Sequence, residues 1–193
     1  MFALQLRLLP PRVALLQMRA RVRARRLGDV FSLTSATTPN KLGLLLRLAQ
    51  RRRYAVELGT GTAWATIGLA VADPLREITS FDVVARPERE QYLALLGEQD
   101  RSRIELVDAA GATGPRSRRP VELLYVDSSH DGEQTVAEFR AWEPVLAPGA
   151  LVVFDDYDHP DYPGVREAIE DLRLTGEQRD FVFVHRHEGP DVG

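Results

Sequence analysis

The sequence has 193 residues, of which 44% are hydrophobic and 27% are charged, and its formal net charge is −3. This length suits one well-buried domain and is short for two, and a slightly acidic chain gives no reason to expect a nucleic-acid partner. The absence of cysteine excludes disulfides, thiolate metal ligands and cysteine nucleophiles. No apolar run reaches the roughly 20 residues of a membrane span, and arginines interrupt the apolar stretches near the N-terminus, so we expect a cytoplasmic protein.

The N-terminal part is strongly basic, because residues 1–30 contain seven arginines and a single acid, Asp29. Apolar residues recur there at helical spacing after the Pro10–Pro11 pair, which predicts an amphipathic helix. We therefore divide the chain into a basic helical extension at residues 1–36 and one domain at residues 37–193. We expect the apolar face of the extension to pack on the domain or on a second subunit of a homo-oligomer. The alternative is contact of its basic face with an anionic membrane.

The rest of the chain alternates between strand and helix patterns. After a helix at about 39–51, the predicted strands lie within 54–61, 77–84, 103–110, 121–130, 150–156 and 180–187, with helices between them at about 63–72, 87–99, 131–142 and 164–174. Alternation at this interval is typical of βαβ units. We therefore predict an α/β fold with a mostly parallel sheet and helices on both faces.

The segment ELGTGTAW follows the first of these strands, at the edge where an open parallel sheet binds its ligand. Gly59 and Gly61 allow the backbone to approach a ligand closely at a helix N-terminus. Asp82 ends the second strand, where a carboxylate can accept hydrogen bonds from a ribose diol, and Asp108 ends the third strand at the same edge. Trp64 stands where a dinucleotide-binding fingerprint needs its third glycine, which argues against that class of site. The alternative is that the glycines only make a tight turn and that the acids cap the segments after them.

Four segments carry a resemblance to a known family: VELGTGTAWATIGLA, SFDVVARPE, VDAAG and LLYVDSSHDGEQTVAEFRAWEPVLAPGALVVFDDY. They resemble the class I S-adenosylmethionine-dependent methyltransferases, and the last is similar to the metal-dependent O-methyltransferase branch that includes the macrolide sugar O-methyltransferases. The resemblance spans about residues 39–173 and implies a Rossmann-like, doubly wound sheet with a late antiparallel strand. It also implies S-adenosylmethionine as the cofactor, held by Glu57, Gly59, Gly61, Asp82 and Asp108. The chain has Ala63 where many relatives have a third glycine, and it lacks a separate substrate-binding domain, which leaves the acceptor undefined.

Carboxylates also end the fourth and fifth predicted strands, where Asp127 follows one apolar run and the Asp155–Asp156 pair follows the other. Like charges at the end of a buried strand repel one another and lose hydration, which is costly unless something compensates. The family resemblance places these two strands side by side, so the three side chains should converge at one edge of the sheet. Such hard oxygen ligands match a divalent cation, Mg²⁺, Mn²⁺ or Ca²⁺, and the resemblance implies the same metal site. The alternative is an acidic loop satisfied by helix capping and solvent.

We predict that the chain transfers a methyl group from S-adenosylmethionine to a hydroxyl group of a small molecule, assisted by the divalent cation. His130 and Asp127 are the candidate catalytic residues, with His130 as general base because it lies three positions after Asp127 and titrates in the useful range. Asp131 and Gln134 should cap the helix that follows. The alternative for His130 is a histidine that only hydrogen-bonds a loop carbonyl.

The alternative functions are a nicotinamide-dependent oxidoreductase on a similar sheet and a non-catalytic binding member of the fold.

Overall fold

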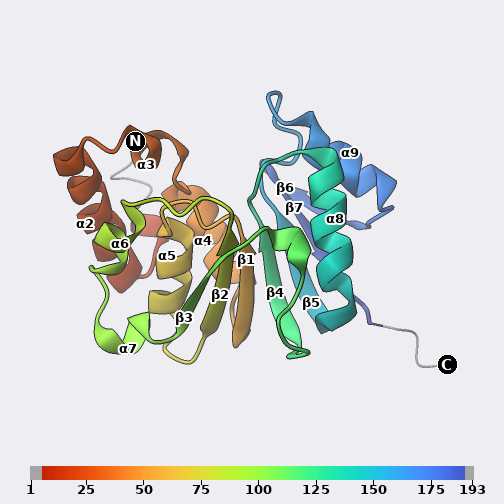
Figure 1. The fold of residues 1–193 in the computed structure, drawn as a ribbon, viewed down its shortest axis with the longest axis horizontal. Coiled ribbons are helices and arrows are strands. Elements are labelled where there is room, and N and C mark those ends of the chain that lie inside the picture. The colour runs from red at the N-terminus through yellow and green to blue at the C-terminus, as the bar shows by residue number, and fades with distance from the viewer. Residues whose placement is uncertain (1–5, 190–193) are drawn as a thin grey trace.

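The computed structural model describes residues 6–189, so residues 1–5 of the predicted N-terminal extension lie outside the described part of the chain. The described residues form a seven-stranded sheet in the order β3-β2-β1-β4-β5-β7-β6 (Figure 1). The strands are β1 (Tyr54–Leu58), β2 (Glu77–Asp82), β3 (Ile104–Asp108), β4 (Val121–Val126), β5 (Leu146–Phe154), β6 (Gly176–Arg179) and β7 (Val182–Arg186). The first five strands pair in parallel, and β7 is antiparallel to both β5 and β6. The predicted mostly parallel sheet with a late antiparallel strand is confirmed.

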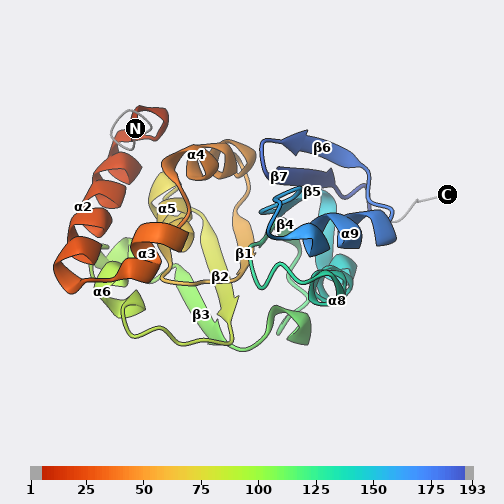
Figure 2. The ribbon, with the colours of Figure 1, turned by 90° about the horizontal axis from the view of Figure 1, so that it is seen from above.

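Helices cover both faces of this sheet (Figures 1 and 2). On one side lie α4, α5 and the N-terminal helix α2, and on the other lie α8 and α9. The helices are α2 (Pro11–Leu27), α3 (Val30–Ser35), α4 (Pro39–Leu48), α5 (Trp64–Ala72), α6 (Arg89–Leu93), α7 (Glu98–Arg101), α8 (Gly132–Trp142) and α9 (Pro163–Asp171), with short 3-10 turns η1 (Leu6–Leu8), η2 (Gly111–Thr113) and η3 (Glu143–Val145).

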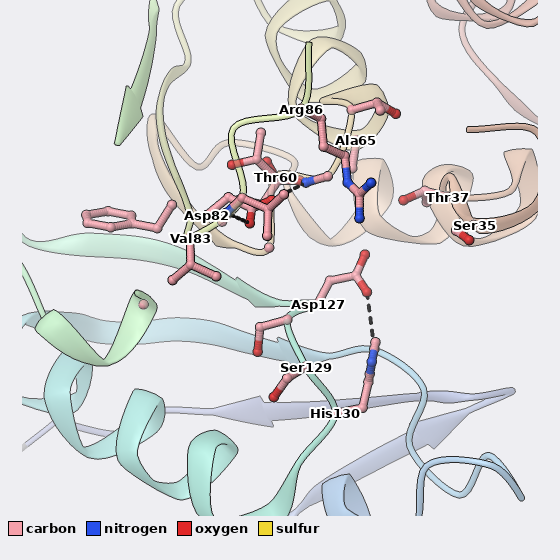
Figure 3. A pocket seen from close by; sticks show the side chains of 18 of the residues that line it. Ser35, Thr37, Thr60, Ala65, Asp82, Val83, Arg86, Asp127, Ser129 and His130 are labelled. Atoms are coloured by element: carbon pink, nitrogen blue, oxygen red, sulfur yellow. Dashed lines mark hydrogen bonds and ion pairs between the residues drawn. The ribbon is translucent and has the colours of Figure 1, made fainter. Parts of the chain in front are cut away.

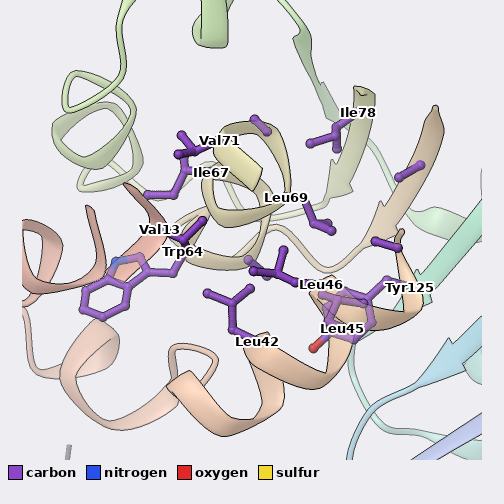
Figure 4. Close-up of a cluster of buried hydrophobic side chains, with 14 of the residues drawn as sticks. Val13, Leu42, Leu45, Leu46, Trp64, Ile67, Leu69, Val71, Ile78 and Tyr125 are labelled. Carbon is purple, nitrogen blue, oxygen red and sulfur yellow. The ribbon is translucent and has the colours of Figure 1, made fainter. Parts of the chain in front are cut away.

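Successive strand residues belong to two different hydrophobic clusters. Ala55 and Leu123 lie in the cluster under α2, α4 and α5, whereas their neighbours Val56 and Leu124 lie in the cluster under α8 and α9. Figure 4 shows the first cluster, in which Leu42 and other apolar side chains of the covering helices lie beside the sheet residues Ile78 and Tyr125. Side chains alternate between the two faces of a strand, so a strand buried on both faces must be apolar throughout. This explains the continuous apolar runs in the sequence.

Helix α2 is packed into the first of these clusters. Val13, Leu16 and Ala20 of the predicted apolar face are buried there together with Ala24, whereas Leu27 at the end of the helix is 48% exposed. The boundary between residues 36 and 37 stays a prediction, as do contacts of α2 with a second subunit or a membrane. Within residues 6–189, no helix is both long enough and apolar enough to cross a membrane.

Three local predictions differ from the structure. Residues 30–35, inside the predicted extension, form a separate short helix, α3, because Asp29 caps them by accepting a hydrogen bond from the backbone N–H of Ser32 at 2.9 Å. The helix predicted at 87–99 is broken into α6 and α7, with Gly97 at the start of the second piece. Strand β6 has no apolar alternation because all four of its residues are exposed, so the sequence pattern does not predict it.

Candidate active site

A pocket of about 450 Å³ opens at the carboxyl ends of β1, β2 and β4. The glycine turn after β1 and Asp82 line one side, while Asp127 and His130 line the other, and Figure 3 shows these side chains facing one space. Its size lies in the ordinary range for a small-molecule site. The pocket therefore sits where an open α/β sheet is expected to bind a ligand.

The glycine turn lies directly against the end of β4. Gly59 has φ +102°, and a Cβ atom added to it would lie 1.9 Å from the carbonyl oxygen of Asp127. Gly61 has φ +52° and donates its backbone N–H to Asp82 Oδ2 at 2.7 Å, but an added Cβ there would meet only Phe31 at 3.8 Å. Glycine is therefore required by space at Gly59 and only by backbone conformation at Gly61.

Asp82 and the buried Arg89 hold the far side of this turn. Asp82 Oδ1 accepts the backbone N–H of Val84 at 2.8 Å. Arg89, on α6, donates to the carbonyl of Gly61 at 3.0 Å and to Asp82 Oδ2 at 3.2 Å. Asp82 therefore fixes the turn as well as facing the pocket, and Arg89 balances part of its charge. The sequence does not single out Arg89, since its acidic neighbours make it look like a residue of a solvated helix.

Asp108 lies outside this pocket. Its side chain is 71% exposed, and its nearest charged partner is Arg89 Nη1 at 3.6 Å. Ala110 and Gly111, just after β3, line the pocket instead. A role for Asp108 in cofactor binding stays a prediction. The pocket lining favours the backbone at Ala110 and Gly111, in place of Asp108, for contact with a bound ligand.

Glu57 is fully buried at the end of β1, beneath the glycine turn. One of its carboxylate oxygens accepts hydrogen bonds from the hydroxyl groups of Thr66 and Ser80. Burial raises the pKa of Glu57 to about 7, and the two hydroxyl donors counter only part of that rise. A carboxyl group whose pKa is higher in the folded than in the unfolded protein destabilises the fold as it ionises.

The Glu57→Gln variant tests this pKa through the pH dependence of stability. The pKa of Glu57 is near 4.5 in the unfolded chain and about 7 in the folded protein. Ionisation of Glu57 should therefore lower the free energy of unfolding of the wild type by about 3 kcal/mol between pH 4.5 and 8. The variant lacks that loss, so its stability relative to wild type should improve by the same amount over this range. Urea unfolding of both proteins at several pH values measures it, and a stability difference that does not change with pH would contradict the raised pKa.

The acidic end of β5 is compensated by a lysine from α4. Lys41 Nζ lies 2.8 Å from Asp155 Oδ1 and 2.5 Å from Asp156 Oδ1. The hydroxyl of Tyr125 lies 3.0 Å from both Asp155 Oδ2 and Asp127 Oδ2, and its single hydrogen is donated to one of them at a time. The three carboxylates predicted to converge are thus brought together, with Lys41 and Tyr125 as their partners.

Asp127 and His130 face each other across the pocket wall (Figure 3). His130 Nε2 lies 3.4 Å from Asp127 Oδ1 and 3.3 Å from Asp156 Oδ2, but it is buried and neither contact has hydrogen-bond geometry. Burial raises the pKa of Asp127 to about 6, helped by the charge of Asp155. Burial alone would lower the pKa of His130. The contacts with Asp127 and Asp156 raise it by more than burial lowers it, so the pKa lies above its ordinary value.

Helix α8 begins directly after His130, and its cap is the predicted one. Asp131 accepts the backbone N–H of Gln134 at 2.9 Å. His130 itself has φ +60° and stacks on Tyr162 at 4.6 Å between ring centroids. The cap and the stack hold the imidazole at the pocket.

Comparison with known proteins assigns the family. A family model described as a methyltransferase domain matches residues 56–157, which is more than half of the chain. The chain belongs to this methyltransferase family. No curated protein matched the sequence.

Solved structures share the methyltransferase fold at low sequence identity. TomG, an O-methyltransferase of Streptomyces achromogenes solved with S-adenosylmethionine, is 24% identical over 89% of this chain and 88% of its own, with a TM-score of 0.62. CalS11, a TDP-rhamnose 3′-O-methyltransferase of calicheamicin biosynthesis, is 21% identical over 75% and 76% of the two chains, with a TM-score of 0.60. Cofactor-bound Rv0187 from MTB is 20% identical over 89% and 91%, with a TM-score of 0.66. These likenesses confirm the predicted Rossmann-like fold.

The divalent cation that the resemblance implied for this methyltransferase does not fit the residues as they are arranged. One oxygen of Asp155 and one of Asp156 already contact the positively charged Lys41 Nζ, which occupies the place between the two acids. Tyr125 lies between the remaining oxygens of Asp155 and Asp127. Among the residues that the structure describes, no group of three or more His, Cys, Asp or Glu side chains is placed to hold a metal ion.

Two further residues at the candidate site escaped prediction besides Arg89. Tyr125 lies inside an apolar strand and looks like an ordinary core residue. Lys41 comes from a helix far from the acids in sequence, and only packing brings it to them. The sequence does offer a signal for Lys41, since it is the single lysine in a chain rich in arginine.

Proposed function

We propose that this methyltransferase transfers a methyl group from S-adenosylmethionine to a hydroxyl group of a small molecule. One observation carries the proposal. The glycine turn with Asp82 and the Asp127–His130 pair face each other across a single pocket. One side has the features of a nucleoside site, and the other side has groups that can accept a proton.

The pocket residues fit this cofactor. A side chain at Gly59 would collide with the backbone of Asp127, so glycine lets the turn lie directly against the end of β4 at the pocket wall. Glu57, Asp82 and Asp127 place carboxyl groups along the pocket, which suits a ligand with a positively charged sulfonium and ammonium group. Asp82 is the residue that we assign to the ribose hydroxyls.

His130 and Asp127 supply the proton acceptor. When bound, S-adenosylmethionine supplies an electrophilic methyl group on a positively charged sulfur. With the cofactor bound, His130 would take the proton of the acceptor hydroxyl as the methyl group passes from the sulfonium to that oxygen, which leaves S-adenosylhomocysteine. Asp127 then stabilises the charged imidazole, because its Oδ1 lies 3.4 Å from His130 Nε2.

The solved neighbours suggest a first acceptor to try. TomG and CalS11 are described as O-methyltransferases, and CalS11 as acting on TDP-rhamnose. We therefore propose hydroxyl acceptors for this chain, and TDP-rhamnose is the first probe for activity.

Calorimetric titration with S-adenosylmethionine and S-adenosylhomocysteine tests the cofactor assignment. Both should bind wild-type protein, and Asp82→Ala should weaken their binding by about 10- to 150-fold, the value of hydrogen bonds to a charged acceptor. Asp108→Ala is the comparison variant, since this acid also ends a strand and approaches Arg89 but lies outside the pocket. Unchanged affinity in Asp82→Ala, or the larger loss in Asp108→Ala, would contradict the assignment.

The same titrations separate the alternative functions. Affinity for NAD and none for S-adenosylmethionine would favour an oxidoreductase, although the family match favours methyl transfer. Affinity for neither compound would favour a non-catalytic member of the fold.

A further inference from the structure

Lys41 occupies an unusual chemical position in this chain. Lysine and arginine together number 25, and Lys41 is the single lysine among them. It lies in the first turn of α4, where Thr38 caps the helix by accepting the backbone N–H of Lys41, and its side chain is 26% exposed. From there its ammonium group reaches the carboxyl end of β5.

The ammonium group lies between two carboxylates, and one of them, Asp155, is almost entirely buried from solvent. The side chain of Asp155 is 4% exposed and that of Asp156 is 17% exposed, and Nζ contacts one oxygen of each. Asp155 Oδ1 also accepts the backbone N–H of Asp156 at 2.9 Å. Burial alone would lower the pKa of Lys41, yet the charges and hydrogen bonds of the two acids raise it above its ordinary value, so that the group is charged.

Lysine suits this place better than arginine. An ammonium group is a compact point charge with three donors on a flexible stem, whereas a guanidinium group is a wide planar fork. A point charge close to several carboxylate oxygens is also what a bound divalent cation supplies. The same oxygens cannot serve both at these distances.

We propose that the Lys41 ammonium replaces the divalent cation at the end of β5, so that this chain binds no such cation there and works without one. Lys41 is then a positioning residue. It holds Asp155 and Asp156, and these acids contact Tyr125 and His130 on either side of Asp127. That turnover needs no cation rests on the proposed methyl transfer. That the wild-type protein binds no cation at this place does not depend on it.

Cation binding by the wild-type protein is the first measurement. After treatment with EDTA, the full chain is titrated with MgCl₂ and MnCl₂ by calorimetry, and its melting temperature is measured with and without each salt. We expect no binding heat and no change in melting temperature. If the wild type turns over TDP-rhamnose or another acceptor, that activity should be the same in EDTA as in Mg²⁺.

Lys41→Ala is the second measurement, because it removes the ammonium and leaves space among the acids. Its melting temperature should fall by about 6 to 12 °C, since it leaves buried carboxylates unpaired. Mn²⁺ or Mg²⁺ should restore much of this loss, because a cation can now take the vacated place. Arg166→Ala is the control, since it removes the exposed partner of Asp158 in the next segment and should change stability little with or without cation.

The outcomes separate clearly. Cation binding or cation-induced stabilisation in the wild type would overturn the proposal, and so would loss of wild-type turnover in EDTA. A folded Lys41→Ala protein that gains no stability from either cation would also overturn it. If Lys41→Ala does not fold, the wild-type titrations decide alone. Because binding heats and melting temperatures need no acceptor, they test cation replacement even if no methyl transfer is found.

Discussion

Gly59→Ala should lower the free energy of unfolding far more than Gly61→Ala, which should lower it by about 1 kcal/mol, the strain of a left-handed backbone with a side chain. At Gly59 an added Cβ would lie 1.9 Å from the carbonyl oxygen and 2.5 Å from the carbonyl carbon of Asp127, and φ is +102°. Backbone atoms of a central strand cannot move aside as a flexible side chain can. The clash and the strain together should cost roughly 3 to 5 kcal/mol.

The two glycine variants form a matched pair, because both residues lie in one turn and have positive φ angles. Urea unfolding of both proteins measures the difference in their free energies of unfolding. Calorimetric titration of whichever variants fold then measures the affinity for S-adenosylmethionine. Equal stability of the two variants would show that the turn and the end of β4 are not in close contact.

His130→Ala should slow methyl transfer by about 10² to 10⁴, the usual contribution of a general base, and should leave cofactor affinity nearly unchanged. The reason lies in the placement of its ring. The ring lines the pocket that also holds the glycine turn, and its Nε2 faces Asp127 and Asp156, whose charges stabilise the imidazolium that forms. The measurement is a single-turnover rate with an acceptor that the wild type methylates, at saturating S-adenosylmethionine.

His159→Ala is the control for this variant. The His159 ring contacts the Tyr162 ring at 5.0 Å between centroids, as the His130 ring does at 4.6 Å, but its own acidic neighbour is the exposed Asp161 and not Asp127. Loss of an aromatic contact alone should therefore affect both variants alike, whereas loss of the base should affect only His130→Ala. A His130→Ala protein with the wild-type rate would mean that another group or water accepts the proton.

Much of the site could be predicted because parallel strands end at one edge of a sheet. Gly59 and Asp127 directly follow a strand and Asp82 ends one, so the alternation of strands and helices already brings them together. The convergence of Asp127 with Asp155 and Asp156 required one more fact, that β4 and β5 are neighbours, and the strand pairing confirms it. The cap of α8 by Asp131 was predictable because it depends on residues three positions apart.

The sequence by itself determined the class of fold and the edge of the sheet at which the site lies, since both depend on local periodicity and on where apolar runs stop. Only the tertiary structure decided how the charges at that edge are balanced. Lys41 lies 115 residues before Asp156 in the sequence. Arg89 stands between two glutamates, and no feature of the sequence shows that its side chain is buried. Which cation meets a buried carboxylate depends on how helices pack across a sheet, and no local pattern of residues records that packing.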